Sequence, residues 1–489
     1  MFRAFKRHDI YAMIALVAAI AVTWCIVYNR LSIRNWNVPI LGASDALLTL
    51  AGEKAAADGN YPLVMLKLNP QLGAPYSANW NDYLSTEDLL TVVSGVFARF
   101  MGLFAAANFM VLLGQVLAGV CFYIVCRLLR YRWQWAFVGS FTFALSHYAF
   151  QRGLGHLILT YYWHIPLCLL VVWWCASRRG LDLSGRQFWF AIAVALITSF
   201  QNPYYTNVFL QFLGLAALAQ FLRRRPWRRV AAPILIGTAA VAGFILMNLD
   251  TIYYQRVHGR NAEPAYRSYQ NLEIYALKPI DLLIPPPDHR SSTARAFAWR
   301  YLYDDSYKTS IHGEMFFPYL GIAGIAALAS LGFISIRRLA AFPRLLLPIH
   351  AIQVTWLVLY SVVGGLNGIF GQFGLTAFRC TDRNSIYILA LALFFAVQAL
   401  TRLTRLWNPG PVVASSLAIL PLILWDQLPP QQTDSSVARA EAALNSDRAF
   451  ALAMQRALPR GAMIFQLPVM KFPESSPINE MGDYEHFRP

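Results

Sequence analysis

Several groups of polar residues stand out in a largely apolar chain, because their types could support acid–base chemistry or bind phosphate. Asp45 lies in Gly42-Ala43-Ser44-Asp45-Ala46-Leu47, where a carboxylate could act as general base toward an acceptor hydroxyl. The alternative is an acid in the first turn of a helix, favoured by the helix dipole. Asp82 lies in Asn79-Trp80-Asn81-Asp82-Tyr83, a mixture of aromatic and amide side chains that suits sugar recognition.

Two further acids and one histidine are candidates with structural alternatives. Glu87 and Asp88 belong to Ser85-Thr86-Glu87-Asp88, which fits a capping box before Leu89 and Leu90. They could therefore cap a helix or take part in a site. His156 follows Gln151-Arg152-Gly153-Leu154-Gly155, and with Arg152 it could bind phosphate or anchor the chain at a lipid surface.

Arginines supply the candidates for binding a phosphate. Arg379 and Arg383 lie in Phe378-Arg379-Cys380-Thr381-Asp382-Arg383-Asn384, and they share a face if this segment is helical. Such charges are costly at a membrane edge unless they are paired or used. We take Arg383 as the best phosphate-binding candidate, with an ion pair to Asp382 or to loop carboxylates as the alternative.

The region from 250 to 315 adds more cations and one acid. A phosphate ligand needs such cations, and arginine can contact it through two N–H groups. Glu314 precedes an apolar run and could be a second carboxylate. The cations of this region are Arg256, Arg260, Arg267, Lys278, His289, Arg290, Arg295 and Arg300.

The elements that must position these residues are membrane-spanning helices. The chain has 489 residues, of which 57% are hydrophobic and only 13% charged, against about 25% charged in soluble domains. Its mean hydropathy is +0.43. These values exclude a soluble enzyme, a disordered protein and a secreted disulfide scaffold. Because a spanning helix needs about 20 mostly apolar residues, we predict an all-α polytopic fold with about eleven spans, at roughly 10–28, 104–126, 133–150, 158–176, 187–201, 204–222, 230–249, 316–335, 345–370, 385–401 and 411–427.

The distribution of charge predicts the orientation. The chain has 41 Lys and Arg against 25 Asp and Glu, a net charge of +16. With the N-terminus in the cytoplasm, the arginine clusters fall in the short inner segments, as the positive-inside rule requires. Clusters of this kind are topology signals rather than a nucleic-acid surface. We therefore expect a bacterial inner-membrane protein whose C-terminus is periplasmic.

Residues 1–427 are expected to form the transmembrane domain, with outer loops at 29–103, 250–315 and 371–384. The first outer loop should hold two surface helices, one after Ser44 that stops at Gly59 and one that begins at the capping box Ser85-Thr86-Glu87-Asp88. Residues 428–489 should form a small outer α/β segment, with a helix from Ser436 to Leu458 and a strand at 462–467. We expect this segment to be an incomplete soluble domain, or a tail packed onto the membrane domain.

The sequence carries no glycine-rich phosphate loop, no Ser-His-Asp order and no metal-ligand spacing. Its six cysteines mostly lie in apolar runs, where they serve as small packing residues. No cofactor or metal site is predicted, although a divalent cation is left open. A nucleotide-sugar donor is not indicated, so an outer-face sugar transfer would need a lipid-carried donor.

With these features the sequence resembles the GT-C superfamily of integral-membrane glycosyltransferases, which use polyprenyl-phosphate sugars on the outer face. The resemblance covers residues 1–427 and rests on the many spans, the long first outer loop and an acid soon after the first span. It implies that Asp45 is the catalytic base. It also implies that Asp82, Glu87 or Asp88 supports acceptor binding, and that Arg383 or a cation of 250–315 holds the donor phosphate.

The chain departs from several GT-C enzymes because no adjacent acidic pair follows the first span. It is also similar to bacterial multispan membrane proteins of unassigned function, in the segment from Pro75 to Asp88, in Gly155-His156, from Pro279 to His289, in Gly313-Glu314 and in the run around Arg383.

The function expected is therefore transfer of a sugar from a polyprenyl-phosphate donor to a cell-envelope glycan or a lipid-linked acceptor. Two alternatives stay open. A lipid-linked oligosaccharide transporter would spread its functional charges through the membrane midplane. A non-catalytic envelope-glycan assembly protein would have outer loops that share no cavity.

Overall fold

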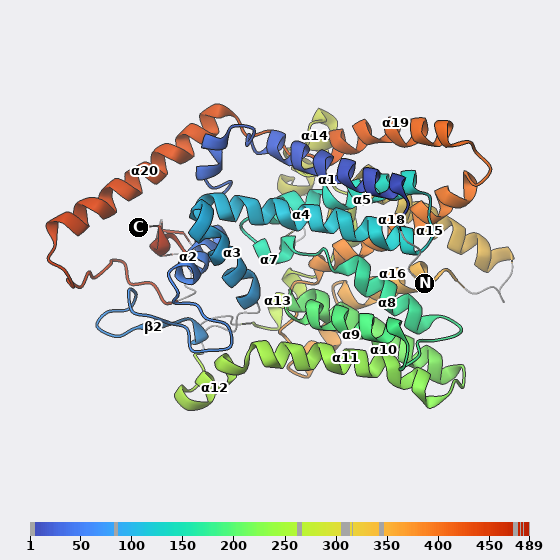
Figure 1. Ribbon diagram of the computed structural model, residues 1–489, viewed down its shortest axis with the longest axis horizontal. Helices are drawn as coiled ribbons and strands as arrows, with labels where there is room; N and C mark the ends of the chain where they lie inside the picture. Colours follow the sequence, from blue (N-terminus) through green and yellow to red (C-terminus); the bar gives the residue numbers. More distant parts are fainter. Residues whose placement is uncertain are drawn as a thin grey trace.

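The computed structural model describes the chain except residues 1–4, 83–86, 262–266, 305–312, 315, 342–346, 473–477, 480, 483 and 489. Most of the described chain is helical, and many of the helices run along the longest axis of the molecule (Figure 1). The N-terminus lies toward one end of that axis and the C-terminus toward the other. The strands β1 (Leu68–Asn69) and β2 (Ala78–Asn79) pair in antiparallel fashion.

Seven of the described helices are long and apolar enough to cross a membrane, as expected for a polytopic membrane protein. Three shorter apolar helices accompany them, α8 (Ile165–Ala176), α9 (Arg186–Ser199) and α16 (Ile349–Ser361). The long ones are α1 (Arg7–Val27), α4 (Leu103–Leu128), α10 (Pro203–Leu222), α11 (Trp227–Met247), α15 (Gly321–Ala341), α18 (Ser385–Leu403) and α19 (Pro409–Gln427).

Each predicted span coincides with helix, but the predicted count of about eleven spans is not confirmed, because three of the runs are broken and a fourth, at α9, has only 14 helical residues. Residues 133–150 divide into α5 (Trp133–Ala144) and α6 (His147–Arg152). Residues 158–176 include the end of α7 (Leu157–Thr160) before α8, and 345–370 divide between α16 and α17 (Leu366–Gln372). Ser146-His147, Pro166 and Gly364-Gly365 lie at these three breaks, but a hydropathy average over the whole run does not register them.

The segment around Asn202 forms a hairpin between two helices. Helix α9 ends at Ser199, and the Asn202 side chain caps α10 by accepting a hydrogen bond of 2.8 Å from the Tyr204 amide. Both α9 and α10 pack against α11, so they lie side by side (Figure 1). Helices α9 and α10 are therefore two antiparallel helices and not one helix broken at Asn202.

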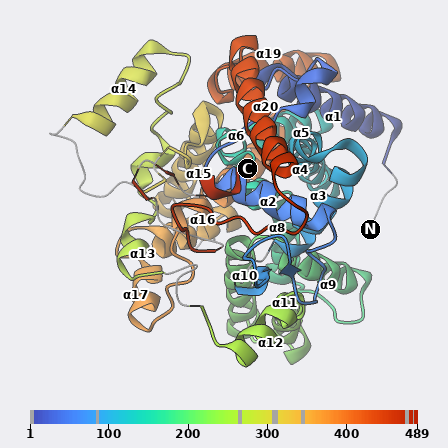
Figure 2. The same ribbon diagram turned by 90° about the vertical axis from the view of Figure 1, so that its left-hand side faces the viewer.

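Short helices gather at the end of the molecule that holds the C-terminus, and Figure 2 shows this end face-on. The two predicted surface helices of the first loop are present as α2 (Asp45–Ala57) and α3 (Asp88–Met101), which pack on each other and on α4. Gly59 follows α2 with φ +88°, as a helix stop requires. The proposed capping residues Ser85 and Thr86 lie outside the described residues.

Further short elements are α12 (Leu249–His258), α13 (Gln270–Ile274), η3 (Pro279–Leu282) and α14 (Ser292–Tyr303). Helix α20 (Asp434–Ala457) agrees with the predicted C-terminal helix. The strand predicted at 462–467 is wrong, because this segment has no pairing partner and its side chains are largely exposed. Residues Glu485–Phe487 form a short 3-10 helix, η5, that packs on α2.

The core that supports this end lies among α4, α5 and α18. Phe122 of α4 stacks on Phe394 of α18 with ring centroids 4.0 Å apart, and Phe143 of α5 packs against Phe122. Close approach of α5 and α18 needs Gly139, because an added Cβ would lie 2.6 Å from a Val397 methyl carbon. These three helices form a fixed support for the short elements that follow them.

Candidate functional site

A cavity of about 1480 Å³ lies among α2, α3, α7, the start of α10 and the 374–383 segment. It brings together residues from loops that are far apart in the sequence. Of the candidate residues singled out from the sequence, nine line it: Asp45, Asp82, Glu87, His156, Arg260, Arg267, Glu314, Arg379 and Arg383.

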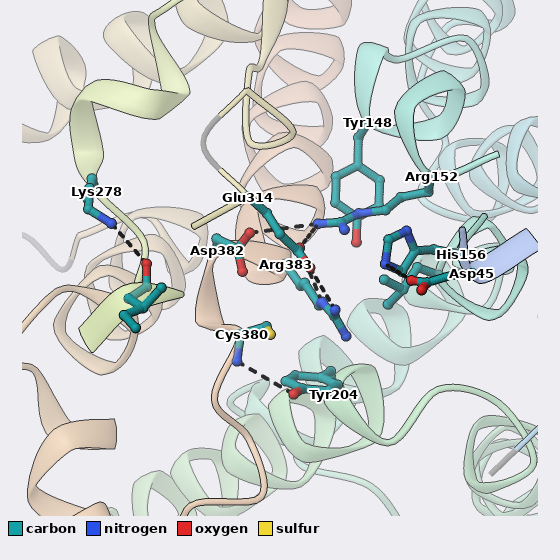
Figure 3. Close-up of polar contacts among 12 residues, drawn as sticks. Asp45, Tyr148, Arg152, His156, Tyr204, Lys278, Glu314, Cys380, Asp382 and Arg383 are labelled. Carbon is teal, nitrogen blue, oxygen red and sulfur yellow. Dashed lines mark hydrogen bonds and ion pairs between the residues drawn. The ribbon is translucent and has the colours of Figure 1, made fainter. Parts of the chain in front are cut away.

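Asp45 begins α2 and faces His156 across the cavity wall. The Nε2 atom of His156 lies 3.1 Å from Oδ2 of Asp45 (Figure 3), and the two side chains are 27% and 39% exposed. Burial lowers the pKa of His156, and the charges of Arg152 and Arg383 add to that effect, although the hydrogen bond to Asp45 opposes it. A neutral imidazole can donate to Asp45 and leave the other carboxylate oxygen free to accept a proton.

Glu87 and Asp88 are neighbours in sequence but face in different directions. Glu87 lines the cavity, and burial, together with the negative charges of Asp88 and Asp45, raises its pKa to about 7, which Arg383 partly offsets. Asp88 is 2% exposed and points away from the cavity. It accepts a hydrogen bond of 2.9 Å from the Tyr61 hydroxyl and pairs with Lys67 Nζ at 2.9 Å.

Lys67 is a buried residue that the sequence did not single out. Its ammonium group contacts the carboxylates of both Asp88 and Asp250. The Asn81 side chain donates to Asp250 at 2.8 Å, so this cluster ties the first loop to the start of α12. Asp250 lies 183 residues after Lys67, and their pairing has no local sequence signal.

Asp82 follows Asn81 in the 3-10 helix η2 (Trp80–Asp82) and lines the cavity. Burial raises the pKa of Asp82, an effect that His258 partly offsets. Trp80 beside it also lines the cavity and packs against Phe472 and Phe487 of the C-terminal segment, with ring centroids 4.9 and 6.0 Å away. The C-terminal segment thus contacts the acidic side of the site.

The cavity lining also includes two arginines of the 374–383 segment, Arg383 and Arg379. Arg383, in the 3-10 helix η4 (Thr381–Asn384), donates from Nη2 to Oε1 of Glu314 at 2.8 Å and from Nε to Oε2 at 3.4 Å. The guanidinium lies over the Tyr204 ring, 4.9 Å from its centroid. Arg379 lies over the Tyr275 ring at 4.9 Å.

Glu314 also pairs with Arg152, which lies behind the cavity wall. Nη2 of Arg152 is 2.6 Å from Oε2 of Glu314 and 3.7 Å from Asp382 (Figure 3). Burial tends to raise the pKa of Glu314, but the charges of Arg152 and Arg383 outweigh it, so this pKa lies well below its usual range. Glu314 is therefore ionised at neutral pH.

The other candidates lie away from the cavity lining: Asp88, His289, Arg152, Arg256, Lys278, Arg290, Arg295 and Arg300. Asp88 belongs to the Lys67 cluster described above. His289 is buried, with Nε2 3.4 Å from Oδ1 of Asp426 and Nδ1 accepting from the Ser291 amide at 3.1 Å. Asp426 also accepts from the Tyr319 hydroxyl at 2.7 Å, so His289 takes part in a contact between the 289–291 segment and the end of α19.

Within the described residues, no group of three His, Cys, Asp or Glu side chains is placed to hold a metal ion. The site that this part of the chain does show is a polar cavity lined by both carboxylates and guanidinium groups. Such an arrangement can remove a proton from one reactant and stabilise negative charge on another.

No protein-family model matches the sequence, and no curated protein matches it. Among solved structures, the chain is similar to the oligosaccharyltransferase of Archaeoglobus fulgidus in its apo form, with 13% identity and a TM-score of 0.43. The alignment covers 94% of this chain and 62% of the archaeal one, so this chain spans less than two thirds of that enzyme. Similarity at this level does not establish a shared activity.

Proposed function

We propose that the protein is a glycosyltransferase that moves a sugar from a polyprenyl-phosphate donor to a hydroxyl group of a cell-envelope glycan or lipid-linked acceptor. The observation that carries the proposal is the shared cavity, which is lined by both the Asp45 carboxylate and the Arg383 guanidinium. The carboxylate suits activation of a hydroxyl group, and the guanidinium suits a phosphate that gains negative charge as it leaves.

Asp45 serves as general base in this reaction. As the acceptor oxygen forms a bond to the anomeric carbon, its proton passes to Asp45. The bond from the anomeric carbon to the phosphate oxygen breaks, and its electron pair leaves with the polyprenyl phosphate, so the configuration inverts. The hydrogen bond between His156 and Asp45 at 3.1 Å orients the carboxylate. Asp82 and Glu87 on the same side contact the acceptor hydroxyl groups.

Arg383 stabilises the leaving phosphate. A guanidinium group matches the geometry of phosphate oxygens and stays charged, and a site shielded from water makes its field stronger. Arg379, Arg267 and Arg260 line the same cavity. They supply further positive charge for the donor.

The reaction takes place on the outer face of a bacterial inner membrane. The arginine clusters at the ends of α4 and α10, among them Arg127 and Arg223, lie at the end of the molecule away from the cavity (Figure 1). The positive-inside rule puts those ends in the cytoplasm. The cavity then opens on the outer side, where sugars are carried on lipids.

The geometry favours this function over the two alternatives. An assembly protein without catalysis was expected to have outer loops that share no cavity, whereas residues of all three predicted outer loops line one cavity. A transporter was expected to spread its charges through the midplane, whereas Asp45, Glu314 and Arg383 gather around one cavity.

The test is transfer of radiolabel from a panel of polyprenyl-phosphate sugars by the purified chain with crude envelope acceptor. Asp45→Asn should abolish transfer. Asp58→Asn, at the far end of the same helix and outside the cavity lining, is the matched control and should keep it. Equal transfer by both variants would remove Asp45 as the base. No transfer from any donor by the unaltered chain would contradict the proposed function, and EDTA in the same assay shows whether a divalent cation is needed.

A further inference from the structure

Arg152 carries a charge that cannot reach a ligand in the cavity. The residue is 1% exposed and is absent from the cavity lining. Its guanidinium lies between two aromatic rings, 5.0 Å from the centroid of Tyr148 and 4.4 Å from that of Phe317. A buried arginine is expensive unless its partners offset the loss of water, so its contacts indicate what it does.

The main partner of Arg152 is the same carboxylate that holds Arg383. Oε2 of Glu314 is 2.6 Å from Nη2 of Arg152, and Oε1 is 2.8 Å from Nη2 of Arg383 (Figure 3). The second contact, from Arg383 Nε to Oε2 at 3.4 Å, fixes the plane of the guanidinium group. Arg383 is therefore oriented by Glu314, and Glu314 is held from behind by Arg152.

We propose that Arg152 is a positioning residue: it holds Glu314 in place, and Glu314 in turn presents Arg383 to the phosphate group of the donor. This inference rests on the proposed function, because it takes Arg383 as the group that binds the donor phosphate. Arg152 itself touches neither substrate. Its effect on binding passes through the charge and the position of the Glu314 carboxylate.

The charges around Glu314 make this role testable by pH. Arg152 approaches it from α6, His156 from the start of α7, and the segment 380–384 contributes Cys380, Asp382 and Arg383. Burial tends to raise the pKa of Glu314, and the charge of Arg152 is the largest influence that lowers it. Without Arg152 the pKa of Glu314 should rise, so that the carboxyl group takes up a proton as the pH falls and releases Arg383.

The experiment measures binding of methyl farnesyl phosphate to the full chain in detergent micelles by calorimetry, from pH 8 to pH 5. This diester keeps its single negative charge over that range, and farnesol is the control without phosphate. The quantity compared is the dissociation constant of a variant divided by that of the unaltered chain at the same pH. The ratio cancels the titration of Glu87 and other cavity groups that both proteins share.

For Arg152→Met the ratio should grow by about tenfold or more between pH 8 and pH 5, because one pKa unit corresponds to a tenfold change in protonation. Arg152→Lys keeps the positive charge, so its ratio should stay nearly constant with pH. Glu314→Gln should bind weakly at every pH. A purely structural role for Arg152 would weaken binding equally across the range.

The outcomes separate this inference from the proposed function. If the unaltered chain binds the diester and the Arg152→Met ratio does not depend on pH, the positioning role is refuted and the donor site stands. If Arg152→Met does not fold, a pH-dependent ratio for Arg152→Lys or strong binding by Glu314→Gln refutes it instead. If the unaltered chain does not bind the diester at all, the donor site fails and the positioning role fails with it.

Discussion

Replacing Lys67 by methionine removes the one ammonium group that lies between the buried carboxylates of Asp88 and Asp250. The side chains of all three residues are 2–3% exposed. Methionine has a similar length and no charge, so the two carboxylates would face each other without a cation. Removing one partner of a buried ion pair costs about 3–5 kcal/mol, because the remaining charge is left without compensation in a medium that solvates it poorly.

The matched control is Lys54→Met in the same loop. Lys54 pairs with Asp58 four residues later, and its side chain is 57% exposed. An exposed pair of this kind contributes roughly 0.3–0.5 kcal/mol, since water solvates the separated charges nearly as well. The Lys67 change should therefore cost several times more than the Lys54 change.

The assay is the free energy of unfolding, from denaturant titration of each variant in the same micelles. Adding Asp88→Asn and Asp250→Asn to Lys67→Met should restore most of the lost stability, because the buried charges are then gone. Equal losses for Lys67→Met and Lys54→Met would refute the reasoning, as would a triple variant no more stable than Lys67→Met alone.

Three further changes test other parts of the structure. Burial raises the pKa of Glu53 in α2 to about 8. The folded chain therefore favours the protonated carboxyl group, and it loses stability as the pH rises through that value and the group ionises. Glu53→Gln should raise the unfolding free energy at pH 9 and not at pH 5. Replacing Phe472 and Phe487 together by alanine should expose the C-terminal segment to limited proteolysis while the helical core stays protected, because both rings pack on Trp80. Gly95→Ala should lower the free energy of unfolding by roughly 1–3 kcal/mol, since the added Cβ would lie 2.5 Å from the Cβ of Ala56 and push α3 away from α2. Gly214→Ala is the control: an added Cβ there meets nothing within 4 Å, so the same assay should show no loss of stability.

The elements could largely be predicted from local signals, and their interruptions could not. Apolar runs identify α1, α4, α11 and α18 within a few residues, because a helix that crosses a membrane is apolar over its length. The breaks between α5 and α6 and between α7 and α8 fall near Ser146 and Pro166, but such residues do not by themselves mark a break, since α11 contains a proline and is continuous. They depend on what packs around them, and those contacts come from distant segments.

The candidate site, too, could be predicted from the sequence only in part. Residue type suggested Asp45, His156 and Arg383, and they meet in one cavity because α2, α7 and η4 converge there. Residue type alone could not separate Glu87, which lines the cavity, from Asp88, which turns toward a lysine. The orientation of Asp88 depends on its buried partners Lys67 and Tyr61. The sequence around the two acids does not indicate this pairing.

The segment 382–383 shows how tertiary contacts decide the role of adjacent charges. An ion pair between Arg383 and either Asp382 or a loop carboxylate was the structural alternative to phosphate binding, and the structure pairs Arg383 with Glu314. Asp382 instead lies 3.7 Å from Arg152. Two buried cations thus share two carboxylates, and only Arg383 and Glu314 of the four reach the cavity lining. The Arg383 guanidinium is held in place by Glu314 and still lines the cavity. A guanidinium that is both fixed and accessible can bind a phosphate in a fixed orientation.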